Sequence, residues 1–392
     1  VTPLVDEVSV DAMGSVIALK KGKENKRVMI AAHIDEIGFM VTHIDKKGFV
    51  RFDTLGGFDP KTLTSQRVII HGKKDIIGVM GCKPVHLMKA DERGKPLPTT
   101  EYFIDTGMKK EEVDKFISVG NAITRERELI EMGECVNSKS LDNRVSVYIL
   151  LETLRKLKDT VVPYDIYAVF TVQEEVGLRG AISSTHHTDP DFGFALDVTI
   201  AFDVPGASPH EMVTKLGEGA AIKIKDGSVI SDYRMVQYMK TTANKHKIKW
   251  QPEVLPAGGT DAGGIQRYGK KGAITGAISI PTRYIHQTIE MATLAMKSDQ
   301  GIVGVPTGLS DLDERLGGLH KSDLVIIAGR PSMGKTALAT NIAYYAAKKI
   351  HDNNEKTSVA FFSLEMSSEQ LSTRILSEQT RIQSNDIRRG KA

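Results

Sequence analysis

Short apolar runs alternate with helix-like spacing over the first three quarters of the chain. Segments 27–35 and 165–172 are mostly apolar, as expected of strands buried on both faces. Beyond residue 143 apolar side chains recur every three or four positions, which predicts a helix with one apolar face: Val147, Leu150, Leu151, Leu154 and Leu157. Strand and helix patterns then alternate to about residue 285. We therefore predict an α/β fold in which helices cover a parallel sheet.

Residues 58–139 have a different pattern. They contain short strand-like segments such as 68–70 and 76–80, Gly/Pro turns and one charged helical stretch, 109–116. This pattern predicts a small β-rich insertion. The flanking segments 1–57 and 140–297 would then form one discontinuous domain.

A third region begins near residue 298, after a polar joint that follows an incomplete helical pattern. Its residues 323–328 predict a strand that runs into a phosphate loop of the form GxxxxGK[ST]. The loop's nucleotide-binding candidates are Gly329, Gly334, Lys335 and Thr336. Backbone N–H groups and Lys335 would hold phosphates, and Thr336 would contact magnesium. We expect 298–392 to be an incomplete P-loop α/β fragment.

Charge and composition remove several classes of function. The 392 residues include 52 Lys and Arg against 49 Asp and Glu, a net charge of +3, which does not predict binding to nucleic acid or an anionic membrane. No apolar run approaches the roughly 20 residues that span a bilayer. Two cysteines and an N-terminus without a signal-peptide pattern predict a cytoplasmic protein.

The adjacent glutamates Glu174 and Glu175 follow a predicted buried strand. Charges at such a position are costly unless they are paired, hydrogen-bonded or bound to metal. Taken alone, the pair could equally be a solvated strand end. Candidate ligands at or near other predicted strand ends change this balance, because the carboxyl ends of parallel strands share one edge of a sheet: His33, Asp35, Asp142, Asp197 and His286.

This set supplies two imidazoles and several carboxylates, which suits zinc, cobalt or manganese. A carboxylate that bridged two cations would place them about 3.5–4 Å apart. One further carboxylate would have to stay off the metals to accept a proton from water. Several residues also have a simpler interpretation: a lone His33 is more often a core or surface histidine than a ligand, and Asp142 or Asp261 could cap a helix. His186 and His187 are expected in a surface loop.

Five segments in order resemble the TET-type dinuclear metallo-aminopeptidases, also known as glutamyl aminopeptidases or endoglucanase-like proteins: 31–40, 139–144, 171–180, 258–262 and 280–286. The resemblance covers residues 11 to about 296. It implies an aminopeptidase that removes N-terminal residues from peptides with a metal-activated water. It also implies that the β-rich insertion is a dimerisation domain that helps to build homo-oligomeric dodecamers.

The resemblance further implies a role for each candidate residue. His33 and Asp197 would hold one metal, Glu175 and His286 the other, and Asp142 would bridge them. Glu174 would be the general base, and Asp35 would fix the tautomer of His33. The chain departs from the family after His286, where Gln287 follows, and after Glu290, where the closing helix breaks off.

Segments 304–313 and 361–368 resemble the RecA-like motor domain of bacterial hexameric replicative helicases. The resemblance implies that Glu365 matches the catalytic carboxylate. No later strand with a magnesium-holding aspartate follows, so we expect no helicase activity and at most weak binding of ATP and magnesium. The junction indicates a chimeric chain. Two alternatives to the peptidase stay open, an ATP-dependent DNA motor and an assembly module with a dead peptidase site; metal analysis distinguishes them.

Overall fold

A computed structural model describes residues 1–90, 93–293, 305–309, 312–313, 319, 325, 335–352, 357–363, 366–380 and 382–390. The chain divides into two compact units, Val1–Leu294 and Ala295–Ala392. In the described residues, no helix is long and apolar enough to cross a membrane.

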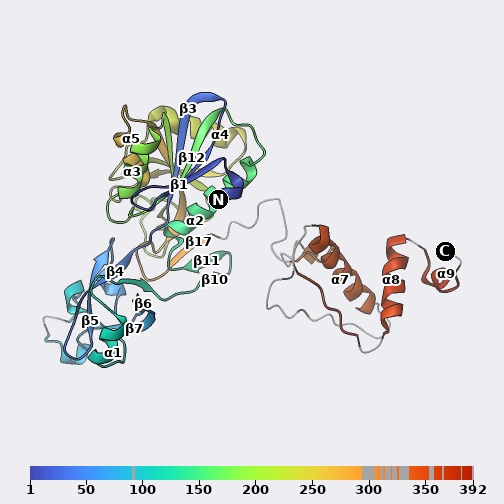
Figure 1. Cartoon of the computed structure of the whole chain (residues 1–392), viewed down its shortest axis with the longest axis horizontal. Helices are drawn as coiled ribbons and strands as arrows, with labels where there is room; N and C mark the ends of the chain where they lie inside the picture. Colours follow the sequence, from blue (N-terminus) through green and yellow to red (C-terminus); the bar gives the residue numbers. More distant parts are fainter. Residues whose placement is uncertain are drawn as a thin grey trace. The chain divides into compact units, whose positions relative to one another are not determined.

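The first unit is built on an 11-stranded sheet (Figure 1). Its strands are β1 (Glu7–Val10), β2 (Val16–Lys20), β3 (Glu24–His33), β10 (Ile130–Met132), β11 (Cys135–Ser138), β12 (Tyr164–Thr171), β13 (Phe192–Ile200), β14 (Ala220–Lys225), β15 (Trp250–Val254), β16 (Ile274–Arg283) and β17 (Glu290–Thr293). The main path runs β1-β2-β12-β3-β13-β16-β17-β11-β10, and β14 joins β15 to β16. The central strands β12, β3, β13 and β16 are parallel.

Helices cover both faces of this sheet. They are α2 (Leu141–Leu157), α3 (Arg179–Thr188), α4 (Tyr233–Lys245) and α5 (Asp261–Tyr268). Because successive strand residues face opposite sides, Ala32 packs in one core with Leu150 of α2, whereas Ala31 packs in another with Ile265 of α5. The predicted α/β fold is therefore confirmed.

The β-rich insertion is a closed barrel in the order β4-β5-β8-β7-β6-β9. Its elements are β4 (Gly38–Ile44), β5 (Val50–Leu55), β6 (Arg67–His71), β7 (Asp75–Gly81), β8 (Phe103–Asp105), β9 (Ala122–Arg125) and the predicted helix α1 (Lys110–Phe116). Short 3-10 turns are η1 (Thr2–Leu4), η2 (Pro60–Thr62), η3 (Val85–Leu87) and η4 (Thr99–Glu101). A separate apolar cluster that includes Phe39, Val68 and Ile104 fills this barrel.

The closed barrel has different bounds from the expected insertion of residues 58–139. The barrel begins with β4 and β5, which lie before residue 58, and ends with β9. Strands β10 and β11 return to the large sheet, where β11 pairs with β17. Local apolar patterns cannot show whether a strand belongs to the barrel or to the large sheet, since a strand has the same period-2 pattern in either one.

Two further expectations differ from the structure. Residues 290–293 form strand β17 between β16 and β11 instead of beginning a helix. His186 and His187 lie in α3 instead of a surface loop. At residues 290–293, pairing with β11 and β16 decides the local conformation.

In the second unit the described helices are α7 (Lys335–Asp352), α8 (Ser368–Thr380) and α9 (Ser384–Arg388). Helix α7 begins at Lys335, the lysine of the phosphate-loop motif. Asp313 accepts hydrogen bonds from the backbone N–H and hydroxyl of Thr307. Gly329, Gly334 and Glu365 lie outside the described residues.

Candidate active site

Strand register places the candidate residues at one edge of the sheet. His33 is the last residue of β3 and pairs with Thr171, the last residue of β12, so Glu174 follows at the same level. Ala195 of β13 pairs with Ala31 of β3, which sets Asp197 level with His33. Asp142 lies at the start of α2, and His286 lies in the loop between β16 and β17. This convergence agrees with the rule for parallel sheets.

His33 faces three carboxylates. Its Nε2 lies 3.1 Å from Asp142 Oδ1, 3.6 Å from Asp197 Oδ1 and 3.8 Å from Glu174 Oε2. The side chain of His33 is 2% exposed. Such a cluster of acids around a buried imidazole needs positive charge for stability.

Asp142 also faces the second histidine. His286 Nε2 lies 3.5 Å from Asp142 Oδ2 and 3.3 Å from Glu175 Oε2. The two oxygens of Asp142 are therefore directed to different histidines. Two ligand groups share this carboxylate, one with His33 and Asp197 and one with Glu175 and His286.

The donors present fit divalent cations. Within each of these groups the donor atoms lie within 4.8 Å of one another. A third group of this kind combines His33, Glu174 and Glu175. The Oε1 atom of Glu175 is buried and lacks a hydrogen-bond partner. In the described part of the chain, the ion-pair partners of Asp142, Glu174, Glu175 and Asp197 are the two histidines.

The Asp35 carboxylate has different hydrogen-bond partners from those expected. Its carboxylate Oδ1 lies 3.6 Å from His33 Nδ1, too far for a hydrogen bond. The backbone carbonyl of Asp35 is the atom within reach of Nδ1, at 3.1 Å. The carboxylate accepts the backbone N–H groups of Glu174 and Glu175, at 3.1 and 3.2 Å. Asp35 thus orients the glutamate pair, because its side chain spans the turn that follows β12.

Both histidines have raised pKa values. Burial lowers the pKa of His33, but the charge of Glu174 and the nearby carboxylates of Asp142 and Asp197 outweigh it. Burial also lowers the pKa of His286, yet Asp142 and Glu175 raise it to about 10. Divalent cations bind the neutral imidazole, so metal binding at this site would release protons.

Glu174 has a pKa well above its usual value. Burial is the main cause; the charges of Asp197 and Asp261 add to it, and His33 opposes it. A carboxylate whose pKa is shifted upward is suited to accept and return a proton near neutral pH.

Two acidic residues at this site were missed in the sequence. Glu290 is fully buried, and its Oε2 accepts the backbone N–H of Asp142 at 2.9 Å. Asp261, interpreted above as a helix cap, is the first residue of α5 and accepts a hydrogen bond from the buried Thr171 hydroxyl. Burial raises its pKa to about 7. Asp261 lies in the resembling segment 258–262 but was interpreted as a cap, whereas Glu290 has no local pattern that distinguishes it from an ordinary surface acid.

A cavity of about 600 Å³ opens beside the histidines and carboxylates. Its other walls come from the end of β13, including Val198 and Ile200, and from the segment 255–260 before α5. Buried Lys223 also lines it and is paired with Glu253 and Asp226. The cavity is large enough for a side chain with flanking backbone.

The phosphate-loop candidates are not described as a group. Lys335 and Thr336 begin α7, whereas Gly329 and Gly334 lie outside the described residues. The Thr336 carbonyl accepts a hydrogen bond from Thr340 at 2.7 Å. Nucleotide binding at this loop stays a prediction.

Comparison with known proteins separates the same two regions. Residues 304–392 match the DnaB-like helicase C terminal domain. The replicative DNA helicase DnaB of Rickettsia conorii is 53% identical over 111 residues, which cover 27% of this chain and 22% of the helicase. The resemblance of this region to replicative helicases is confirmed.

Residues 14–298 match M42 glutamyl aminopeptidase. The lysyl aminopeptidase of Pyrococcus furiosus is 35% identical, over 74% of this chain and 83% of its own. The TET aminopeptidase from Thaumarchaeota archaeon SCGC AB-539-E09 is 38% identical with a TM-score of 0.72, over 75% and 83% of the two chains.

The Pyrococcus horikoshii TET1 peptidase, which assembles into a tetrahedron or a large octahedral shell, is 31% identical with a TM-score of 0.66, over 73% and 84% of the chains. These matches confirm the resemblance derived from the five sequence segments. Because the match covers most of the chain and the fold that carries the histidine and carboxylate cluster, the chain belongs to the M42 glutamyl aminopeptidase family of metal-dependent hydrolases.

Proposed function

We propose that the chain removes N-terminal residues from peptides with the help of two divalent ions, zinc, cobalt or manganese. His33 and Asp197 would hold one ion, Glu175 and His286 the other, and Asp142 would bridge them. The observation that carries the proposal is the placement of the two Asp142 oxygens, 3.1 Å from His33 and 3.5 Å from His286. A bridging carboxylate has this geometry.

The ions would polarise the peptide carbonyl and acidify a water molecule. Glu174 would take the proton from that water and pass it to the leaving amine, consistent with its raised pKa. Asp35 would hold Glu174 and Glu175 through their backbone N–H groups. The cavity beside Glu174 would hold the substrate's N-terminal residue.

Metal analysis tests this proposal. Wild-type protein should carry about two equivalents of transition metal per chain, as a dinuclear site requires. Asp142→Ala should lose both ions, since both of the proposed ligand groups share that carboxylate. Asp105→Ala, an exposed acid of the barrel, is the matched control and should keep both. A folded wild-type protein that binds no metal would sink the proposal.

We further propose a homo-oligomer, a dodecamer built from dimers with the barrel as the dimer contact, in the cytoplasm. The assembly of the related Pyrococcus horikoshii TET1 peptidase supports the homo-oligomer. The free cysteines Cys82 and Cys135 support the cytoplasmic location. Light scattering on the purified chain gives the mass; a monomer at micromolar concentration would refute the oligomer.

For the second unit we propose at most weak nucleotide binding at the phosphate-loop residues Gly329, Gly334, Lys335 and Thr336, without a motor function. Titration with a fluorescent ATP analogue and magnesium tests it. DNA-stimulated ATP hydrolysis that Lys335→Ala abolishes would instead favour the motor.

A further inference from the structure

The two histidines are held in different ways. His33 ends a central strand and is 2% exposed, so the backbone hydrogen bonds of the sheet fix it. His286 lies in the loop 284–289 and is 40% exposed. Its φ is 60°, and that of Tyr284 is 64°, both in the left-handed region that L-residues rarely adopt. A loop of this kind keeps its conformation only if neighbouring structure holds it.

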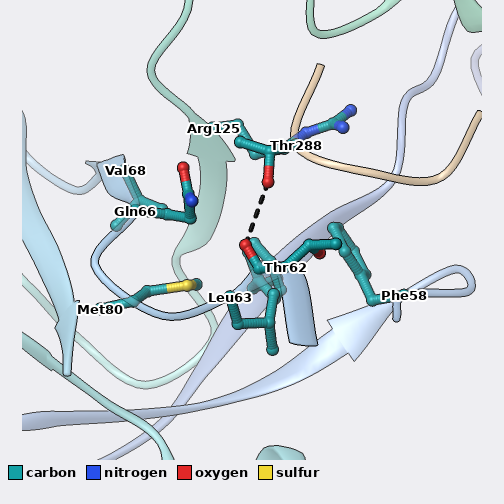
Figure 2. A pocket seen from close by; sticks show the side chains of 9 residues that line it. Phe58, Thr62, Leu63, Gln66, Val68, Met80, Arg125 and Thr288 are labelled. Carbon is teal, nitrogen blue, oxygen red and sulfur yellow. Dashed lines mark hydrogen bonds between the residues drawn. The ribbon is translucent and has the colours of Figure 1, made fainter. Parts of the chain in front are cut away.

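The barrel supplies contacts to this loop. Thr288, two residues after His286, donates its hydroxyl to the Thr62 carbonyl of the barrel at 3.0 Å (Figure 2). Arg125, the last residue of β9, donates to the carbonyl of Gln287. In Figure 2, Arg125 lies beside Thr288 at one side of a small pocket lined by barrel residues such as Phe58 and Met80.

The same guanidinium reaches the other side of the site. Arg125 also donates to the backbone carbonyl of Lys139, three residues before Asp142. Its side chain is 3% exposed. A planar guanidinium can serve two carbonyls at once because its N–H groups lie in a fixed fork, which a lysine ammonium lacks. Arg125 thus connects the backbone beside His286 to the backbone before Asp142.

A second barrel segment passes close to the same ligands. A Cβ atom added to Gly57 would lie 3.2 Å from His286 Nδ1, and one added to Gly56 would lie 3.4 Å from Glu175 Cβ. These contacts involve Glu175 and His286, whereas His33 and Asp197 lie in β3 and β13 of the large sheet. The barrel therefore contacts one half of the site.

We propose that the barrel is a clamp for the His286 loop, with Arg125 as its positioning residue. The affinity for the cation held by Asp142, Glu175 and His286 then depends on Arg125 and Thr288. The cation held by His33, Asp142 and Asp197 shares only Asp142 with the clamped ion, so its affinity should depend on the clamp much less. This inference rests on the proposed two-metal function.

Titration of the metal-free full chain with cobalt(II) tests the clamp, with the visible absorption of each bound equivalent as the readout. His286→Ala identifies the band of the clamped ion. Arg125→Lys keeps the positive charge but loses the forked arrangement of N–H donors. It should lower the affinity for that ion roughly 10- to 100-fold, the range for partners that orient metal ligands. Thr288→Val replaces the side chain by one of nearly equal volume and should lower the affinity for the same ion roughly fivefold, as for the loss of one neutral hydrogen bond.

The affinity for the other equivalent should fall much less than that for the clamped ion in both variants, because the two ions share only Asp142. Thr124→Val is the matched control, because it removes a barrel hydroxyl that bonds His71 and not the loop; it should bind both ions as wild type does. Wild-type affinity for the clamped ion in both variants overturns the clamp, and so does equal weakening of both ions. Failure of the wild-type chain to bind two ions overturns the proposed function instead.

Discussion

Asp142 combines a bridging geometry with a position at the start of a helix. Ser140 is the N-cap residue of α2 but makes no side-chain capping hydrogen bond, and Asp142 itself has a non-helical backbone conformation. The backbone N–H of Asp142 donates a hydrogen bond to Glu290 Oε2, and its carboxylate contacts the two histidines. The histidine contacts lower the pKa of Asp142 although burial opposes them. A buried carboxylate that stays ionised is a strong ligand for a cation.

Replacement of Glu174 by glutamine separates metal binding from proton transfer. Glu174→Gln should keep both ions, since the two ligand groups that share Asp142 do not include it. Turnover of an aminoacyl chromogenic substrate should fall about 100- to 10,000-fold, the range for loss of a general base. Metal content and kcat are measured on the same sample. Retained turnover would refute the base assignment, and loss of metal would make Glu174 a ligand.

The ion pair between Asp203 and Arg283 predicts a pH-dependent stability. Arg283 donates to both carboxylate oxygens, at 2.7 and 2.8 Å, and lowers the pKa of Asp203. A lowered folded-state pKa stabilises the protein above the unfolded pKa of about 3.9, and this contribution is lost as the pH falls through the folded value. The pair is partly exposed, so its contribution is about 1 kcal/mol or less.

Asp203→Asn should therefore lower the free energy of unfolding at pH 7, and its difference from wild type should shrink below about pH 4. Urea unfolding across this pH range measures it. A difference that is constant with pH would contradict the titration of Asp203.

At the scale of elements, α2 joins the apolar core to the metal centre. Its buried Leu150 packs against the sheet, eight residues after Asp142. Leu150→Ala should cost about 2–5 kcal/mol because it leaves a cavity in a closely packed core. Chemical denaturation measures the loss, and metal content under folding conditions should stay at the wild-type value. An exposed apolar residue of the same helix, such as Tyr148→Ala, is the control and should change stability little.

Elements with strong local patterns were predictable. The strands β3 and β12 and the helices α1 and α2 follow from apolar runs and three- to four-residue spacing. Strand β17 was not predictable, because residues 290–293 take an extended conformation through their pairing with β11 and β16. The assignment of residues 38–55 to the barrel was equally unpredictable from local patterns, since strand pairing decides it.

At the scale of the whole molecule, the clusters of histidine and carboxylate ligands found among the described residues lie in the first unit. Removal of metal should therefore lower the melting temperature of that unit and leave any transition of the second unit unchanged. At a free metal concentration 100 times the Kd, binding adds about 2.7 kcal/mol to the stability of the folded state. Differential scanning calorimetry with and without a chelator measures this. A shift of every transition by the same amount would contradict the division.

The sequence alone determined the α/β class, the helicase-like region and the residues His33, Asp142, Glu174, Glu175, Asp197 and His286 as one candidate group. It could do so because strand ends and residue chemistry are local properties. The tertiary structure decided how these residues face one another, that Asp35 holds the glutamate pair, and that Glu290, Asp261 and Arg125 adjoin the site. Those relations depend on contacts between residues far apart in the chain, which burial and hydrogen bonding select only once the sheet and the barrel are packed.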